Sequence, residues 1–449
     1  MTKNQNTEVP DQHTPYSISG QGADKEYIVR LIYEYNPHLR GGKITAPGIK
    51  RDLYNEIEKW MSRKQIIAIT GLRRTGKSTL MRQAMLPLGQ DAAYFSFDEE
   101  ETQKKDTLVF IIEFMLKELK ARYIFLDEIH YVSDWEGVLK RYYDQRGVKF
   151  IISGSESMEL DKAKPSLGGR MAPFTLEPMS FREYLMLKGY RTERFGMGQM
   201  EQAYHKLLPD KEKLEREFTD YVFKGAFPEL VSETDEQVIG KYIQEIVVKK
   251  IIYRDIPRIF QIRRNDLLYD LMRYACENTT GLFDVRNLCN IFKSDYETVS
   301  NYIFYLKTAF LIKIAESYSK SPATRMKRNK KVYASHPSIA LAVLGYRREM
   351  LVDRLMGQFV ESAFAQRYFW RDKHKNEVDA ILTEGGLVPL EVKYRSTISA
   401  SDIGGVLKFM ERYNATKGLV ASKDIFEKKV IDGREIWFIP AWCLMLALS

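Results

Sequence analysis

The chain has 449 residues, enough for about two to four domains that each bury their own core. Hydrophobic residues make up 44% and charged residues 29%, as in ordinary soluble globular proteins, and no apolar run approaches the roughly 20 residues that span a bilayer. The net charge of +9 favours a polyanion such as nucleic acid as a partner, although an indifferent basic surface fits it equally well. The three cysteines lie far apart, so no zinc spacing or disulfide framework is visible, which fits a reducing cytoplasm.

The first third of the chain predicts strands that alternate with helices. Residues 1–25 are polar, lack the apolar stretch of a signal peptide, and are expected to form a disordered tail. Hydrophobic spacing then predicts helices at 51–63, 79–86 and 107–120 and strands at 66–69, 93–97, 123–126 and 150–152. This alternation predicts an α/β fold whose parallel sheet is covered by helices on both faces.

A glycine-rich loop follows the first predicted strand and matches the phosphate-binding pattern of P-loop proteins. Glycines permit backbone angles that aim N–H groups at phosphate oxygens, and the N-terminus of the next helix adds a favourable dipole. We expect Lys77 to reach the β- and γ-phosphates of ATP and the Ser78 hydroxyl to ligate Mg²⁺. The predicted ATP-binding residues are Gly71, Leu72, Arg73, Arg74, Thr75, Gly76, Lys77, Ser78 and Thr79.

Two carboxylates end the predicted strand at 123–126, where open α/β sheets bind their ligands. Asp127 is predicted to hold Mg²⁺, through water, and Glu128 to orient or deprotonate the water that attacks ATP. The next strand ends in a serine-rich turn. Ser153 or Ser155 is a candidate for contact with the γ-phosphate, and a plain turn is at least as probable for either serine.

These motifs resemble an AAA-like family of archaeal and bacterial P-loop ATPases that carry a C-terminal winged-helix and PD-(D/E)xK nuclease-like part, formerly of the DUF4143 type. The resemblance covers nearly all of the chain after residue 45 and rests on residues 71–78, 125–129, 152–155, 169–170, 176–184 and 225–228. It implies that Arg170 senses the γ-phosphate, in its own subunit or a neighbour's, a role that suits a forked cation. A surface arginine that pairs with an acid is an equal alternative.

The alternation of strands and helices stops near residue 178. We expect an AAA-like ATPase domain at 26–200, a helical linker or lid at 201–260, a winged-helix-like domain at 261–350 and a small nuclease-like α/β domain at 351–449.

Two short helices joined by a polar turn are predicted around Ser294, which begins a capping-box pattern. This arrangement suggests a helix-turn-helix followed by a wing strand at 310–318. Six of the twelve residues at 320–331 are basic and none is acidic, so a mobile loop that contacts DNA phosphates is expected, with a solvated loop on a packing module as the alternative. The DNA-contacting candidates are Thr298, Asn301, Arg325, Lys327, Arg328, Lys330 and Lys331.

Near the end of the chain, residues 377–382 alternate like a strand, and Glu391 and Lys393 share one face of a second strand. With Glu361 from the preceding helix and Asp379, they resemble the PD-(D/E)xK nuclease site. Asp379 and Glu391 are candidate Mg²⁺ ligands, and Lys393 is a candidate for activating water or steadying charge on phosphate. A residual fold that does not cleave is the alternative.

Three functions remain open from the sequence. The first is a multidomain ATPase that acts on DNA, unspecified as to duplex or branched form. The second is a signalling or scaffold switch that binds protein partners under the control of ATP, with an inert nuclease-like domain. The third is a nuclease in which ATP is a structural ligand. A homo-oligomer is possible in each case.

Overall fold

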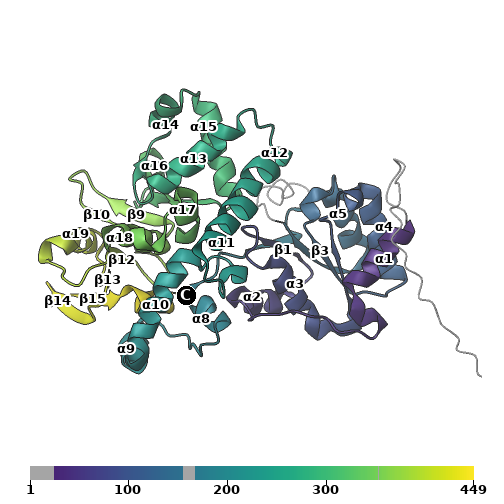
Figure 1. The fold of residues 1–449 in the computed structure, drawn as a ribbon, viewed down its shortest axis with the longest axis horizontal. Coiled ribbons are helices and arrows are strands. Elements are labelled where there is room, and N and C mark those ends of the chain that lie inside the picture. The colour runs from purple at the N-terminus through teal and green to yellow at the C-terminus, as the bar shows by residue number, and fades with distance from the viewer. Residues whose placement is uncertain (1–24, 155–166, 352, 449) are drawn as a thin grey trace, which may run out of the picture.

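The computed structural model describes residues 25–154, 167–351 and 353–448. Three five-stranded sheets organise these residues, and helical segments connect them (Figure 1). The predicted tail at 1–25 lies outside the described residues except for Lys25, which begins the first helix. Among the described residues, no helix combines the length and the apolar character needed to cross a membrane.

The first sheet is entirely parallel and has the strand order β2-β3-β4-β1-β5. Four of its strands fall where the apolar runs predict them, whereas the edge strand β5 is not predicted. Its pattern is mixed, and Pro173 is tolerated there because an edge strand needs fewer backbone donors. The strands are β1 (Ile66–Thr70), β2 (Ala92–Ser96), β3 (Tyr123–Asp127), β4 (Lys149–Ser153) and β5 (Met171–Thr175).

Helices cover both faces of this sheet, as predicted, because successive residues of each strand point to opposite sides. In β1, Ile67 and Ile69 pack with α2 (Asp52–Trp60) and α3 (Lys77–Met85), and Ile66 and Ala68 pack on the other side. That second face is covered by α1 (Lys25–Tyr35), α4 (Lys105–Lys117) and α5 (Trp135–Arg146). The carboxyl ends of the strands therefore meet at one edge.

The middle of the chain is helical, as expected. A nearly continuous helical run from 236 to 259, here called the 236–259 helix, follows α10 and has a π-helical middle (Figure 1). It packs against α13 and α17, and it also reaches the loop that follows β1. It follows three helices along the chain, α8 (Phe181–Leu187), α9 (Met200–Leu207) and α10 (Lys211–Lys224), and its two packing partners are α13 (Asn265–Glu277) and α17 (Pro337–Leu344).

The second sheet joins segments on both sides of residue 350, in the order β10-β9-β7-β8-β6, where β9 (Tyr368–Arg371) and β10 (Glu377–Val378) lie beyond that residue. β7 and β8 form an antiparallel hairpin, and β7 also pairs in parallel with β9 beyond the predicted boundary. The elements before that boundary are β6 (Leu282–Phe283), α14 (Val285–Phe292), α15 (Tyr296–Thr308), β7 (Ile312–Ser317), α16 (Pro322–Lys327) and β8 (Lys330–Ala334).

Two local expectations in this region are wrong. The cap of α15 is Asp295 rather than Ser294, because the Asp295 carboxylate accepts the Thr298 N–H at 2.8 Å. The basic segment 320–331 is also not one loop, since it contains α16 and the beginning of β8.

The third sheet has the order β11-β12-β13-β15-β14, and the chain enters it at Asp379. The predicted strand at 377–382 is wrong as a single element: β10 pairs with β9 in the second sheet, β11 pairs with β12 in the third, and Asp379 is the bend between them. The elements are α18 (Asp353–Ala363), β9 (Tyr368–Arg371), β10 (Glu377–Val378), β11 (Ala380–Leu382), β12 (Val388–Lys393), α19 (Gly404–Tyr413), β13 (Lys417–Ser422), β14 (Glu427–Ile431), β15 (Arg434–Pro440) and α20 (Ala441–Ala447).

Candidate functional site

The glycine-rich loop connects β1 to α3 at the carboxyl edge of the parallel sheet. Gly71 has a φ of 143°, and a side chain there would meet the Leu176 carbonyl oxygen at 2.3 Å. Gly76, directly before α3, has a φ of 98°. Both positions require glycine, because side chains are strained at these angles. The result is a tight loop of backbone N–H groups that ends on a helix N-terminus, which is an anion-binding geometry.

Lys77 lies deep in this loop. Its Nζ donates to the carbonyl oxygens of Gly71 at 3.0 Å and Leu72 at 3.2 Å, and the side chain is buried. Burial lowers the pKa of Lys77, while the carboxylates of Glu128 and Asp127 act in the opposite direction. An ammonium held by neutral carbonyls in a desolvated place is well suited to bind an incoming anion.

Asp127 ends β3 with both carboxylate oxygens held by hydroxyl groups. The Tyr94 hydroxyl donates to one oxygen at 2.5 Å, and the Ser153 hydroxyl donates to the other. Ser153 also accepts the Glu128 N–H at 3.1 Å. Ser153 is fully buried, so in this conformation it orients the two acids rather than facing the cavity. Ser155 lies outside the described residues.

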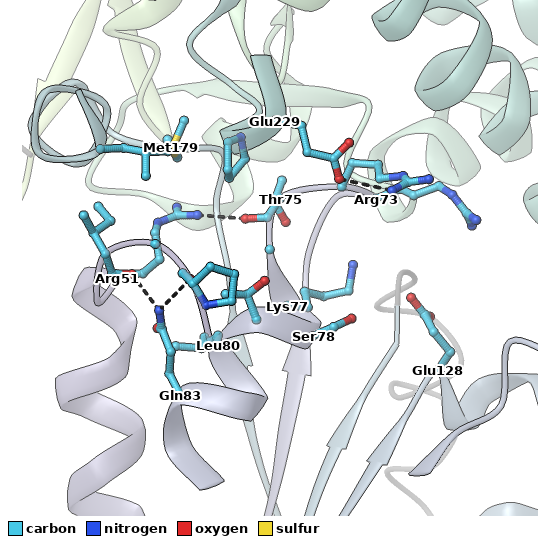
Figure 2. Close-up of a pocket in the computed structure, with 18 of the residues that line it drawn as sticks. Arg51, Arg73, Thr75, Lys77, Ser78, Leu80, Gln83, Glu128, Met179 and Glu229 are labelled. Atoms are coloured by element: carbon cyan, nitrogen blue, oxygen red, sulfur yellow. Dashed lines mark hydrogen bonds and ion pairs between the residues drawn. The ribbon is translucent and has the colours of Figure 1, made fainter. Parts of the chain in front are cut away.

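Glu128 faces Lys77 and Ser78 across a cavity of about 820 Å³ (Figure 2). Its backbone has a left-handed φ of 52°, which turns the side chain out of the strand direction. One carboxylate oxygen lies 3.3 Å from Nδ1 of His130. The acid that is predicted to act on water thus lines the same cavity as the lysine and serine that are predicted to hold phosphate and Mg²⁺.

The opposite end of the cavity is apolar. Leu80, Met179 and Leu187 line it together with residues 47–49. Gln83 shapes this wall, because its amide donates to the Ile49 carbonyl oxygen at 2.9 Å. An apolar slot next to a phosphate loop suits a flat nucleobase. The sequence alone does not reveal this wall, since its parts come from three separate segments.

The 236–259 helix supplies cations to the same cavity, which sequence reasoning missed. Lys250 and Arg254 line it, and Asp255 pairs with Arg73 of the loop at 3.2 Å. The charge of Arg73, together with burial, lowers the pKa of Lys250, as expected where cations crowd together. Arg74, the next residue of the loop, pairs at 3.1 Å with Glu229, which precedes the 236–259 helix. The crowding of positive charge favours a polyanionic ligand.

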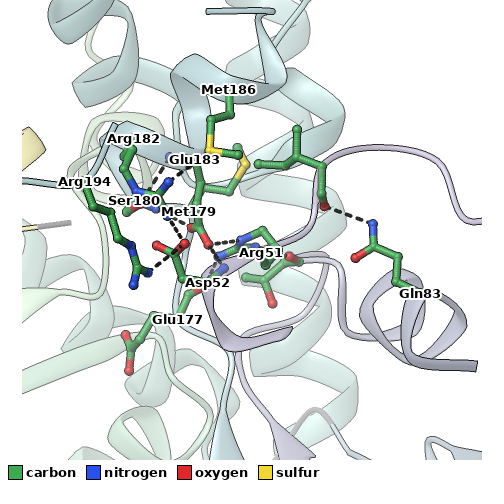
Figure 3. Close-up of polar contacts among 12 residues, drawn as sticks. Arg51, Asp52, Gln83, Glu177, Met179, Ser180, Arg182, Glu183, Met186 and Arg194 are labelled. Atoms are coloured by element: carbon green, nitrogen blue, oxygen red, sulfur yellow. Dashed lines mark hydrogen bonds and ion pairs between the residues drawn. The ribbon is translucent and has the colours of Figure 1, made fainter. Parts of the chain in front are cut away.

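Arg51 fastens the loop to the segment after β5 (Figure 3). Its guanidinium donates to the carbonyl oxygens of Thr75 and Glu177, both at 2.9 Å, and pairs with Glu183 at 2.8 Å. The side chains of Arg51 and Glu183 are 8% and 5% exposed, so the charges compensate each other inside the protein. The sequence resemblance included Glu183 but gave no hint of its partner.

Arg170 lies at the wrong edge of the sheet for its own nucleotide site. Its carbonyl oxygen accepts the N–H of Ile66, the first residue of β1, whereas the phosphate loop follows the last residue of that strand. The guanidinium pairs with Asp144 at 3.0 Å. The predicted γ-phosphate contact within the same subunit is therefore wrong, and a contact with a neighbouring subunit stays a prediction.

A second polar cluster lies in the C-terminal part. Glu391 and Lys393 pair on β12, and Asp379 accepts the Val392 N–H at 2.8 Å, so the three residues come together as predicted. Glu361 from α18 joins them through a residue that was not predicted here, Lys331. Burial and neighbouring carboxylates raise the pKa values of Glu361 and Glu391.

Lys331 is a buried ion-pair residue, so its assignment as a DNA contact is wrong. Its side chain is 2% exposed and points into the C-terminal cluster. Burial acts to lower its pKa, but the charges of Glu361 and Asp379 outweigh this and raise the pKa. As arranged here, the carboxylates do not fit Mg²⁺, because a lysine stands among them. Within the described residues, no group of three or more His, Cys, Asp or Glu side chains is arranged to hold a metal ion.

The other DNA-contacting candidates differ in their freedom to reach a partner. Asn301 and Lys327 are exposed, whereas Thr298, Arg325, Arg328 and Lys330 are half-buried. Arg325 donates to the Ser319 carbonyl oxygen at 2.7 Å, and Arg328 donates to the Tyr318 and Arg371 carbonyl oxygens at 3.3 Å. These arginines therefore hold α16 against its neighbours, and Asn301 and Lys327 are the most accessible of the set.

The sheet order, the phosphate loop and the Asp127–Glu128 pair define a P-loop ATPase domain. Residues 63–185 match the family described as an AAA domain, residues 215–349 match a domain of unknown function, DUF8612, and residues 350–444 match another, DUF4143. The AAA-domain and DUF4143 matches support placement of the chain in an AAA-like ATPase family, as the sequence motifs indicate.

Two relatives from Methanocaldococcus jannaschii resemble nearly the whole chain. The uncharacterized protein MJ1637 is 25% identical over 427 residues, which cover 88% of each chain. The uncharacterized protein MJ1544 is 23% identical over 406 residues, which cover 86% of this chain and 89% of that protein. The arrangement of this chain is therefore shared over most of its length with proteins of similar extent.

Two solved structures are similar at a much lower level. The RuvB Holliday junction branch migration motor of Thermotoga maritima is 14% identical, with a TM-score of 0.28, over 72% of this chain and 95% of that chain. DnaA from Aquifex aeolicus, bound to AMPPCP, is 15% identical, with a TM-score of 0.24, over 62% of this chain and 92% of that chain. These TM-scores are too low for any feature of those proteins to be carried over.

Proposed function

We propose that this protein binds ATP with Mg²⁺, hydrolyses it, and uses the cycle to act on DNA. The observation that carries the ATPase part is the cavity in which Lys77 and Ser78 face Glu128. A phosphate loop alone binds nucleotide, but a carboxylate across from it also provides a way to activate water. The AAA-domain match supports the same activity.

The residues of the cavity have distinct roles in this proposal. The loop N–H groups and Lys77 bind the phosphates, and the apolar wall of Leu80, Met179 and Leu187 receives the base. Ser78, and Asp127 through water, would hold Mg²⁺, which would neutralise charge on the phosphates. Glu128 orients the attacking water and accepts its proton, for which its carboxylate turns from His130 toward the phosphate end.

The order of elements from α13 to β8 supports the DNA part. A helix, a short strand, two helices and a β-hairpin follow one another, with β6 paired to β8, as in a winged helix. Asn301 is exposed on the second of the two helices, and Lys327 is exposed beside the hairpin. Such a module would place one helix in a groove and the basic segment along the phosphates.

The C-terminal part supports a nuclease-like fold. A helix, α18, precedes the strands, and α19 connects β12 to the parallel strand β13, with Glu391 and Lys393 on β12. Lys331 weighs against cleavage in this conformation, because it occupies the carboxylates that a metal ion would need. This observation favours the second candidate function, in which ATP controls the binding of protein partners and the nuclease-like part is inert.

Turnover of ATP in the presence of DNA separates the two candidates. Phosphate release by the full chain would be measured with saturating duplex, forked and single-stranded DNA, with the Lys77→Ala variant as the background. Stimulation by at least one DNA form supports action on DNA. Hydrolysis that no DNA form changes overturns the DNA part and leaves the protein-binding switch. Hydrolysis that survives in Lys77→Ala overturns the assignment of the site itself.

A further inference from the structure

A lysine of the second sheet enters a cluster of carboxylates at the place where the second sheet meets the third. Nζ of Lys331 lies 2.6 Å from Glu377, 3.2 Å from Glu361 and 3.6 Å from Asp379. Three carboxylates around one small cation resemble the surroundings that proteins give to a bound metal ion. The ammonium thus stands at the centre of the very acids that the nuclease-like fold brings together.

The lysine and the acids belong to different parts of the chain. Lys331 lies on β8, where its backbone pairs with Ala315 of β7 and Leu282 of β6. The carboxylates come from α18, β10 and the bend between β10 and β11, all of which lie beyond residue 350. Glu377 lies in the same sheet as Lys331, whereas Glu361 and Asp379 lie outside its strands, so the cluster depends on the position of β8 relative to α18 and to the bend at Asp379.

One acid of the cluster retains an unused oxygen. Glu391 is 93% buried by side-chain packing, with a relative exposure of 7%, and its Oε2 has no hydrogen-bond partner. Its other oxygen is held by Lys393. A buried carboxylate oxygen without a partner is costly, and a ligand that completes the cluster would remove this cost. The carboxylates of the cluster are thus neutralised by Lys331, but the Oε2 atom of Glu391 still lacks a hydrogen-bond partner.

We propose that Lys331 is an internal competitor for a divalent cation in this cluster. Docking of β8 places the ammonium among Glu361, Glu377 and Asp379 and closes the site, and withdrawal of β8 opens it to the metal ion. The proposal rests on the nuclease-like assignment only for what the open site would do. Competition for the carboxylates is a separate property and can be measured without any substrate.

The position of Lys331 links this competition to the basic segment. Lys327 is exposed four residues earlier, and Lys330 is adjacent and half-buried. A polyanion that binds these lysines acts on the same short stretch of chain that carries Lys331 into the cluster. Binding of DNA and opening of the carboxylates would then be coupled, because both depend on the position of β8.

Binding of Mn²⁺ to the full chain, without nucleotide, tests the competition by calorimetry. The Lys331→Met variant is expected to gain one Mn²⁺ site, at least about tenfold tighter than any site in the unsubstituted protein, because the competing ammonium is removed. The gained site should disappear in Lys331→Met with Asp379→Asn. Lys331→Arg keeps the positive charge and should bind like the unsubstituted protein. ATP binding checks that each variant is folded.

A second variant covers the case in which Lys331→Met does not fold. Lys331→Gln removes the positive charge and keeps all of the carboxylates, so a gain in Mn²⁺ affinity is expected in this variant as well. Equal Mn²⁺ binding by the unsubstituted protein and Lys331→Met, abolished in both by Asp379→Asn, would overturn the competition. So would the absence of a gained site in both Lys331→Met and Lys331→Gln.

DNA cleavage by the same variants reports separately on the proposed function. If Lys331→Met gains the Mn²⁺ site and cleaves plasmid DNA, the competition and the nuclease assignment both stand. If it gains the site but leaves the plasmid intact, the competition stands and the nuclease assignment fails. Cleavage by the unsubstituted protein at the rate of Lys331→Met would overturn the inhibitory role of the lysine.

Discussion

The nucleotide cavity and the Lys331 cluster are built from the same kinds of side chain, lysines and carboxylates that helices and strands bring together. In the cavity, Lys77 donates to backbone carbonyls while Glu128 lies on the opposite wall. In the cluster, Lys331 bonds to the carboxylates themselves. A lysine that is held only by neutral carbonyls is more readily available to an incoming phosphate than a lysine that is held by carboxylates. The comparison teaches that spacing in the sequence identifies the groups but not whether they are open to a ligand.

The largest effect is expected at Glu128, the acid that faces Lys77 across the nucleotide cavity. Glu128→Gln should bind ATP with little change but hydrolyse it about 10²-fold or more slowly, because the amide does not accept a proton from water. Phosphate release and a fluorescent-nucleotide titration measure the two properties. Glu229→Gln is the matched control, since Glu229 lines the same cavity and pairs with Arg74. Equal losses in the two variants would remove the special role of Glu128.

The second-largest effect is expected at Arg51, which holds the phosphate loop of the nucleotide cavity in place. Arg51→Met leaves Glu183 buried without its partner, so the free energy of unfolding of the ATPase domain should fall by about 3–5 kcal/mol. The Thr75 carbonyl loses its donor in the same variant, so ATP affinity should fall as well. Chemical denaturation followed by tryptophan fluorescence measures the first quantity.

Arg194→Met is the control for this change. Arg194 also pairs with an acid near the loop, Asp52 at 2.8 Å, but its side chain is 58% exposed (Figure 3). Water screens such a pair, so the loss should stay within about 1 kcal/mol. If the two variants lose the same free energy of unfolding, the buried pair of Arg51 and Glu183 has no special role in holding the phosphate loop.

Much of the open site could be predicted because its signals are local. The apolar run before Gly71 and the run before Asp127 each fit one strand, and parallel strands bring their carboxyl ends to one edge. The cations of the 236–259 helix and Arg51 could not be predicted. They reach the loop from segments distant in sequence, and only packing of the whole chain brings them there.

The closed cluster resisted prediction for a different reason. Lys331 ends a basic run that resembles a solvated loop, and nothing next to it in sequence indicates burial. Its compensating acids lie 30 or more residues later, on α18 and β10, and only the pairing of β10 with β9 and of β9 with β7 brings β10 into the same sheet as β8. Likewise, the alternation at 377–382 fits one strand, but the change of sheet at Asp379 depends on two different pairing partners.

His336 shows how burial changes the pKa of a titratable group that contacts a hydroxyl group rather than a carboxylate. His336 contacts Ser338 and the ring of Tyr221, and burial lowers its pKa to about 3. The unfolded chain therefore binds a proton below the ordinary pKa of 6.5 that the folded protein does not. The contribution of neutral His336 to the free energy of unfolding is fully present above pH 6.5. It should decrease by about 1.4 kcal/mol per pH unit as the pH falls from 6.5 toward 3.

His336→Asn isolates this contribution, because asparagine can still cap α17 but does not titrate. Denaturation of both proteins between pH 7 and pH 4 should show a steeper loss for the unsubstituted protein, since all other acids are common to the pair. Parallel pH profiles would mean that His336 is protonated without cost and that burial alone does not suppress a charge here.

The smallest effect separates the exposed lysine of the basic segment from the buried one. Lys327→Ala should weaken DNA binding a few-fold and reduce the slope of log affinity against log salt by about 1, because one phosphate contact is lost. Lys105→Ala is the control: Lys105 is also exposed, but it lies on the ATPase domain and pairs with Asp134. Fluorescence anisotropy over a salt series measures the slope. An unchanged slope for Lys327→Ala would leave the basic segment without a role in DNA contact, and the position of Lys331 would then be coupled to something other than DNA.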